Sequence, residues 1–148
     1  MQLVTAERLS THLLLSARLV YELGDPHSTL RATTDRGGPA VIIHAGGEID
    51  AYNEGTWRQL LDEAAAVAAA PGPFVVDVSG LDFMGCCAFA ALAEEAERCR
   101  ERGIELRLAS HQPIVARIVE SCGLSRMLPV YPTVDAALDA STAGSICS

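Results

Sequence analysis

The sequence FVVDVSGLDFMGCCA, residues 74–88, contains a short apolar run, a loop and the start of an amphipathic segment. The run Phe74–Val78 is almost continuously apolar, which is typical of a strand buried on both faces of a sheet. After the loop Ser79–Cys87, apolar residues recur at helical spacing: Phe89, Leu92, Ala96 and Cys99. The stretch therefore predicts a strand, a loop and a second helix in succession, with Cys99 in the core.

A strand and a first helix are predicted upstream of this stretch. Ala40–Ala45 is short, apolar and rich in β-branched residues, which indicates a strand. The helix is predicted by an apolar face at helical spacing: Trp57, Leu60, Leu61, Ala64 and Ala68. Asp50 is its predicted N-cap, because an Asp carboxylate accepts hydrogen bonds from the free N–H groups of a first turn. Pro71, Gly72 and Pro73 end the helix.

The alternation continues downstream. Ile104–Ala109 predicts a strand with Ile104 on its inner side, and Ser110 as cap with Pro113 in the first turn predicts a third helix. The inner stripe of that helix is Val115, Ile118, Val119 and Cys122. Gly103 and Gly123 stand where helix ends favour a left-handed residue. A last strand, Met127–Val130, and a last helix, Pro132–Ala140, complete the pattern.

The N-terminal part is less regular. Ser28–Thr34 alternates weakly and predicts a first strand, whereas Leu9–Tyr21 fits either a short helix or an edge strand. Strands alternating with helices predict an α/β fold built on a mostly parallel sheet.

Composition excludes several classes of protein. The chain has 148 residues, the size of one domain, and a formal net charge of −8. Its basic residues are all Arg and form no basic patch, which argues against nucleic-acid binding. No apolar stretch is long enough to cross a membrane, and the N-terminus lacks the pattern of a signal peptide. Five Cys at spacings that match no zinc site favour a reducing, cytoplasmic location without metal or cofactor.

In this order, the elements resemble the STAS domain, in particular the bacterial anti-sigma factor antagonists. Three pieces carry the resemblance, which runs from about Leu30 to Ala140. They are Gly47–Asp50, Val76–Met84, and a closing segment that holds Gly123-Leu124, Pro129–Pro132 and Ala136–Leu138. The resemblance implies an α/β STAS fold with a mostly parallel sheet of about five strands and about four helices. It places a STAS domain at residues 28–141, an extension at 1–27 and a flexible tail at 142–148.

The resemblance also implies a binding function without catalysis. The expected partner is an anti-sigma factor, in some members also a kinase, and the expected assembly is a monomer or homodimer. The family signature is Asp-Ser-(Ser/Thr)-Gly at the start of the second helix, and its first Ser is phosphorylated to end binding. Here these positions hold Gly85, Cys86, Cys87 and Ala88. We expect the partner to dock on them and on neighbouring residues: Gly47, Glu48, Asp50, Asp82, Phe83 and Met84.

The replaced signature leaves three interpretations open. Cys86 and Cys87 could simply substitute small residues for small residues in an antagonist that has lost its switch. Alternatively, the protein is a thiol-based redox sensor, because the first-turn N–H groups and helix dipole at a helix N-terminus favour the thiolate. Third, it is a scaffold subunit of a larger assembly. Neither His44 nor the pair Glu48 and Asp50 is tied to a nucleophile, so no catalytic residue is predicted.

Overall fold

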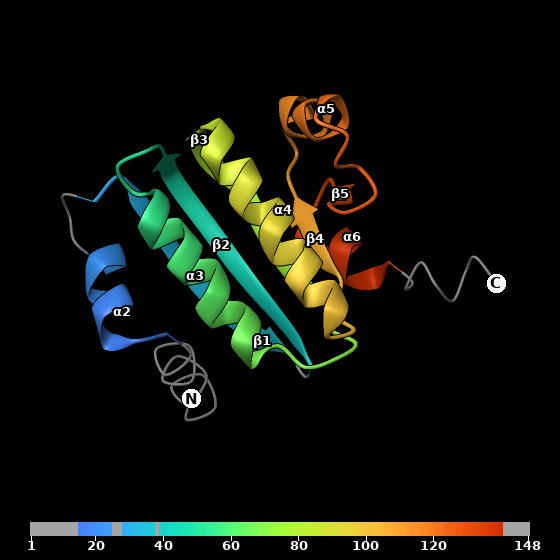
Figure 1. The fold of residues 1–148 in the computed structure, drawn as a ribbon, viewed down its shortest axis with the longest axis horizontal. Coiled ribbons are helices and arrows are strands. Elements are labelled where there is room, and N and C mark those ends of the chain that lie inside the picture. The colour runs from blue at the N-terminus through green and yellow to red at the C-terminus, as the bar shows by residue number, and fades with distance from the viewer. Residues whose placement is uncertain (1–14, 25–27, 38, 141–148) are drawn as a thin grey trace.

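The computed structural model describes residues 15–24, 28–37 and 39–140, which build a mixed five-stranded sheet with helices on both faces (Figure 1). The strands lie in chain order. The strands β1 (Leu30–Gly37) and β2 (Ala40–Ile49) form an antiparallel hairpin. Next come β3 (Phe74–Met84), β4 (Leu106–Ala109) and β5 (Val130–Tyr131), each parallel to its neighbour. The predicted α/β class and mostly parallel sheet are confirmed.

One face of the sheet carries the main core. The helices α3 (Glu54–Val67) and α4 (Cys86–Glu101) lie side by side across it, and α2 (Ala17–Gly24) lies beside α3 (Figure 1). α5 (Pro113–Ser121) adds two valines to this core. α6 (Val134–Asp139) packs on the opposite face through Ala137, against Val75 and Ala109. Large side chains that are fully buried include Trp57, Phe74, Leu60, Leu92 and Leu106.

The segment Leu9–Tyr21, for which the sequence left helix and edge strand open, is helical from Ala17 onward. Leu19 and Leu23 of α2 are buried and belong to the main core. Residues 9–14 and the predicted tail at 142–148 lie outside the described residues.

Both central strands are longer than predicted. β2 continues past Ala45 to Ile49, and β3 continues past Val78 to Met84, so most of the predicted loop is strand. Their ladder runs on through register shifts between His44 and Gly46 and between Gly47 and Glu48. In a sequence these glycines read as turn signals, but here they let two bulged strands approach closely.

Several smaller predictions are corrected. Ile104 precedes β4, and all four residues of that strand are buried because helices cover both faces. The last strand is Val130–Tyr131, since Met127 and Leu128 donate backbone hydrogen bonds to Leu124 in a turn. The cap position of α5 is Gln112, because Ser110 accepts from the Gln112 N–H in a turn ahead of the helix.

The remaining predictions concern two glycines at helix ends and two cysteines. Gly103 and Gly123 have φ of 79° and 72°, which confirms them as left-handed terminators. Cys99 is fully buried, as predicted. Placing Cys122 in the core was wrong: α5 ends at Ser121, and Cys122 is an exposed cap residue past the inner stripe.

Among the described residues, no helix combines the length and apolar character that crossing a membrane requires.

Candidate functional site

The ends of β2 and β3 meet the start of α4 at one end of the sheet. Glu48 pairs with Phe83, and Ile49 pairs with Met84. The Gly85 N–H donates to the Ile49 carbonyl over 2.9 Å, which fixes the turn from β3 into α4. The structure thus brings together three segments predicted as site residues: 47–50, 82–84 and 85–88.

The Gly47–Asp50 segment is anchored to the start of β1. Gly47 has a φ of 92°, and a Cβ at this position would collide with the Thr29 carbonyl, so only glycine fits. The Asn53 side chain donates to the Glu48 carbonyl and to the Thr29 hydroxyl, both over 2.9 Å. Its amide oxygen accepts from the Asp50 N–H over 2.9 Å. The Asn53 side chain therefore binds the backbone at Glu48 and at Asp50 and also binds Thr29.

Asp50 does not cap α3. Its carboxylate accepts from the N–H groups of Tyr52 and Asn53 at 3.0 and 3.3 Å, which makes a turn ahead of the helix. α3 then begins at Glu54, and Asn53 occupies its cap position. Sequence reasoning missed Asn53. The signal was there, because Asp and Asn side chains both favour such local turns over helix.

The first turn of α4 presents the two thiols unequally. Gly85 has no side chain to cap the helix, Cys86 is exposed, and Cys87 is half-buried. Ala88 is fully buried, and its carbonyl accepts a hydrogen bond of 3.2 Å from the indole N–H of Trp57 on α3. Trp57, predicted as a packing residue, therefore also secures the start of α4.

The accessible part of these three segments is acidic, apolar and thiol-bearing. Glu48, Asp82 and Cys86 are exposed, and Phe83 is 53% exposed. Asp50, Met84, Gly85 and Cys87 are half-buried, whereas Gly47 and Ala88 are buried. No basic residue occurs in residues 47–50 or 82–88. Such a surface suits a partner that offers apolar and basic side chains.

His44 lies farther back along β2 from this surface, where it pairs in the ladder with Asp77 of β3. Its ring nitrogens lie 3.1 Å from Asp77 and 3.1 Å from Asp35. The hydrogen bond to Asp77 is the main cause that raises the pKa of His44. Burial would raise the pKa of Asp77, but hydrogen bonds from His44 and Ser79 outweigh it and leave that pKa lowered. The trio is a structural ion cluster that ties β1, β2 and β3 together.

The buried thiol of Cys99 and the acidic groups suggest no second site. Burial is the main cause that raises the pKa of Cys99 to about 11, so this thiol stays protonated. Within the part of the chain that the structure describes, His, Cys, Asp and Glu form no group of three able to hold a metal ion.

Comparison with known proteins places this geometry in a family. Residues 31–137 match the STAS domain. The chain is 71% identical over 144 residues to Rv2638, a candidate anti-anti-sigma factor of Mycobacterium tuberculosis, with 97% of each chain covered. It is 57% identical over 113 residues to the anti-sigma-F factor antagonist RsfA of the same species, over 76% of this chain and 88% of RsfA.

A solved structure agrees with these matches. An anti-sigma factor antagonist from Mycobacterium paratuberculosis superposes with a TM-score of 0.66 and 25% identity, over 78% of this chain and 96% of that chain. The chain therefore belongs to the STAS domain family, within the group of anti-sigma factor antagonists, which are non-enzymatic regulators.

Proposed function

We propose that this protein binds an anti-sigma factor and thereby releases a sigma factor for transcription. The docking surface, as we define it, comprises the accessible residues of segments 48–50 and 82–87. One observation carries the proposal: segments more than thirty positions apart are fixed into one surface by Gly85, Asn53 and Trp57. The names of the relatives support the same partner class.

We further propose that Ser phosphorylation does not control this docking surface. The position where the family carries its phosphorylated Ser is Cys86, and a Ser kinase does not phosphorylate a thiol. A phosphate would bring about −1.5 to −2 charges to the first turn of α4. Without that charge the protein stays in its binding-competent form unless another modification reaches Cys86.

Thiol oxidation is the modification that the exposure of Cys86 favours. The Cys86 thiolate would attack hydrogen peroxide, forming an S–O bond and breaking the O–O bond. The sulfur is oxidised to sulfenic acid, and the peroxide is reduced with release of hydroxide. The product alters an exposed side chain of the docking surface, at the start of α4. Cys99 is buried and serves as an internal comparison that should not react.

Isothermal titration calorimetry against each anti-sigma factor of the host, expressed singly, tests the partner. We expect at least one to bind with a Kd below about 10 µM, which is about 7 kcal/mol of binding free energy. The variant Cys86→Glu should bind at least tenfold more weakly, because it places a charge where phosphate acts in the family. Ala66→Glu, on an exposed position of α3, is the matched control and should bind like wild type.

The results of these measurements distinguish the antagonist, the scaffold subunit and the redox sensor. If no anti-sigma factor binds, the antagonist function is wrong and a scaffold subunit is favoured, which sedimentation of the native assembly would show as a large complex. If Cys86→Glu binds with wild-type affinity, the anti-sigma factor does not dock on this surface. If Cys86 is alkylated no faster than free cysteine at neutral pH, the proposed redox control is wrong.

We expect the protein to act in the cytoplasm as a monomer or homodimer, and an anti-sigma factor of the kinase type is one candidate partner. Sedimentation equilibrium of the purified protein measures the oligomeric state directly.

A further inference from the structure

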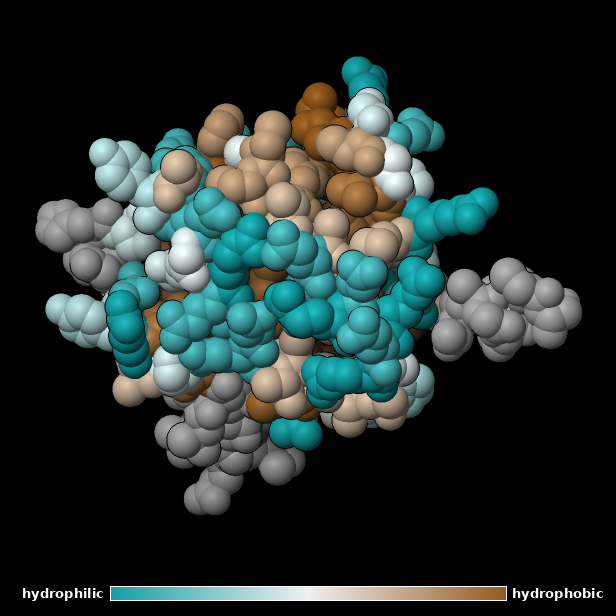
Figure 2. Space-filling view, in the orientation of Figure 1, coloured by the Kyte–Doolittle hydropathy of each residue, from teal (hydrophilic) through white to brown (hydrophobic). Residues whose placement is uncertain are grey.

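An apolar hollow opens beside the docking surface, between the end of β3, the first turn of α4 and α5. Its volume is about 260 Å³, and its walls include Leu81, Phe83, Met84, Phe89, Ile114 and Ile118. Figure 2 shows the matching surface: brown and tan atoms gather at the end of the molecule where α4 begins and α5 lies, whereas the flank over α3 and α4 is teal. Among its lining residues the one charged group is Asp82.

Hydrogen bonds of the Gln112 side chain join two walls of the hollow, the start of α5 and β3. The Gln112 side-chain amide donates to the carbonyls of Ser79 and Leu81 over 3.3 and 3.4 Å. These bonds fix the start of α5 against the outer part of β3. Ile114 and Phe83 then stand at the rim as residues that are 51% and 53% exposed. Two large apolar side chains are thus kept in solvent at the mouth of a preformed hollow.

The size of the hollow favours a protein side chain over a small molecule. Small-molecule pockets span roughly 300–1,000 Å³ and enclose most of their ligand, whereas this hollow is smaller and open. Interface anchors are apolar side chains that fill such preformed pockets at the centre of a contact. Asp82, Phe83 and Met84 belong to both the hollow and the docking surface, so one partner would cover both.

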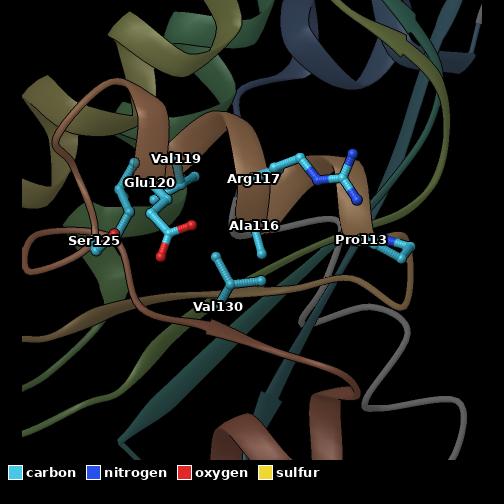
Figure 3. Close-up of a pocket in the computed structure, with 8 residues that line it drawn as sticks. Pro113, Ala116, Arg117, Val119, Glu120, Ser125 and Val130 are labelled. Carbon is cyan, nitrogen blue, oxygen red and sulfur yellow. The ribbon is translucent and has the colours of Figure 1, made fainter.

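A second hollow provides a contrast on the other side of α5. It measures about 350 Å³ and lies between α5 and β5, with Arg117 and Glu120 among its walls (Figure 3). Opposite charges there select neither sign of partner. At the first hollow the one charged lining residue is Asp82, and the exposed Glu48 pairs in the ladder with Phe83 of its wall. These two negative charges complement a basic partner.

We propose that the hollow receives an apolar side chain of the anti-sigma factor, flanked on the partner by Arg or Lys that face Asp82 and Glu48. Ile114 and Phe83 are then specificity-determining contacts, and Gln112 is a positioning residue. This inference rests on the proposed function and adds to it: α5, which the docking surface does not include, takes part in partner choice.

Calorimetry with the anti-sigma factor that binds wild-type protein tests the inference. Ile114→Asp should weaken binding at least tenfold, and Ile114→Ala about fivefold, because anchors near the centre of an interface dominate its affinity. Ala116→Asp is the matched control: it lies on the same helix, is exposed and lines the second hollow, so its Kd should stay within twofold of wild type. Circular dichroism of each variant checks that the fold is kept.

Methyl NMR gives a readout that does not depend on variants. Addition of the anti-sigma factor should shift the methyl signals of Ile114 and Ile118 and leave that of Val41, in the core under α3, unchanged. If wild type binds while Ile114→Asp binds equally well and these methyls do not move, the inference is overturned and the proposed function stands. If wild type binds no anti-sigma factor, both fall.

A different occupant would also overturn the inference. Should Ile114→Asp convert a dimer into a monomer in sedimentation equilibrium without changing partner affinity, the hollow belongs to a contact between two copies of this chain.

Discussion

Replacing Glu95 by Gln should stabilise the protein at pH 8 and leave its stability almost unchanged at pH 4.5. Glu95 lies on α4 with its side chain only 5% exposed. Arg98 contacts both Glu95, at 2.8 Å, and Asp62 of α3, at 3.0 Å. Burial, then the hydrogen bond with Asp62, raises the pKa of Glu95 from 4.5 to about 7, and Arg98 only partly opposes them. Between pH 4.5 and about 7 the folded protein therefore holds a proton on Glu95 that the unfolded chain releases.

The sign and the size of the effect follow from proton linkage. A carboxyl with a raised pKa in the folded state costs nothing below its unfolded pKa of 4.5. It destabilises the fold increasingly as the pH rises from 4.5 to about 7, and the cost is constant at higher pH. Each pH unit corresponds to about 1.4 kcal/mol, so the ceiling is about 3 kcal/mol. We therefore expect Glu95→Gln to gain about 1–3 kcal/mol at pH 8.

Urea unfolding of both proteins at pH 4.5, 6, 7 and 8 measures this difference in free energy of unfolding. Glu94→Gln is the matched control, since Glu94 is exposed and pairs with Arg58 at 2.6 Å. Its effect should stay within about 1 kcal/mol, as for exposed ion pairs, and should not change between pH 6 and 8. A difference between Glu95→Gln and wild type that is equal at pH 4.5 and pH 8 would show that the environment of Glu95 does not oppose its ionisation.

Three further predictions concern other residues. His44→Gln should destabilise the protein at pH 6 and much less once the pH exceeds the raised pKa of His44, because the charged ring is stabilised by two carboxylates; thermal melts from pH 6 to 9 would show a pH-independent loss if that were wrong. Asn53→Ala removes three hydrogen bonds and should cost about 1–3 kcal/mol, with weaker partner binding in calorimetry. Trp57→Phe keeps most of the packing but leaves the Ala88 carbonyl without its donor, and should cost about 1–3 kcal/mol in urea unfolding; no loss would mean that the bond contributes nothing.

Apolar spacing predicted the helices and strands because it reports which face of each element is buried. The stripes of α3 and α4 are the clearest cases, and Cys99 follows from the second of them. Strand length was harder to predict. Gly46, Gly47 and Gly80 weaken a strand pattern, yet in the fold they are the residues that permit the bulged ladder between β2 and β3.

Local competition and long-range contact explain the other differences. An Asp side chain can cap a helix or close a turn. Asp50 closes a turn, and the Asn53 side chain that follows it donates a hydrogen bond to the distant Thr29. The hollow could not be predicted, because Gln112 and Leu81 are 31 positions apart and no local pattern links them. The docking segments were predictable in sequence, but the participation of α5 was not.

The hydrogen bond from Trp57 to α4 gives the protein a built-in optical reporter. Trp57 is the single tryptophan of the sequence, is fully buried, and binds the backbone of the turn that carries Cys86 and Cys87. Indole emission responds to the polarity and hydrogen bonding around the ring. A rearrangement of that turn would therefore change the emission wavelength or the quantum yield of Trp57. Partner capture and thiol chemistry can therefore be followed in real time on the unlabelled protein.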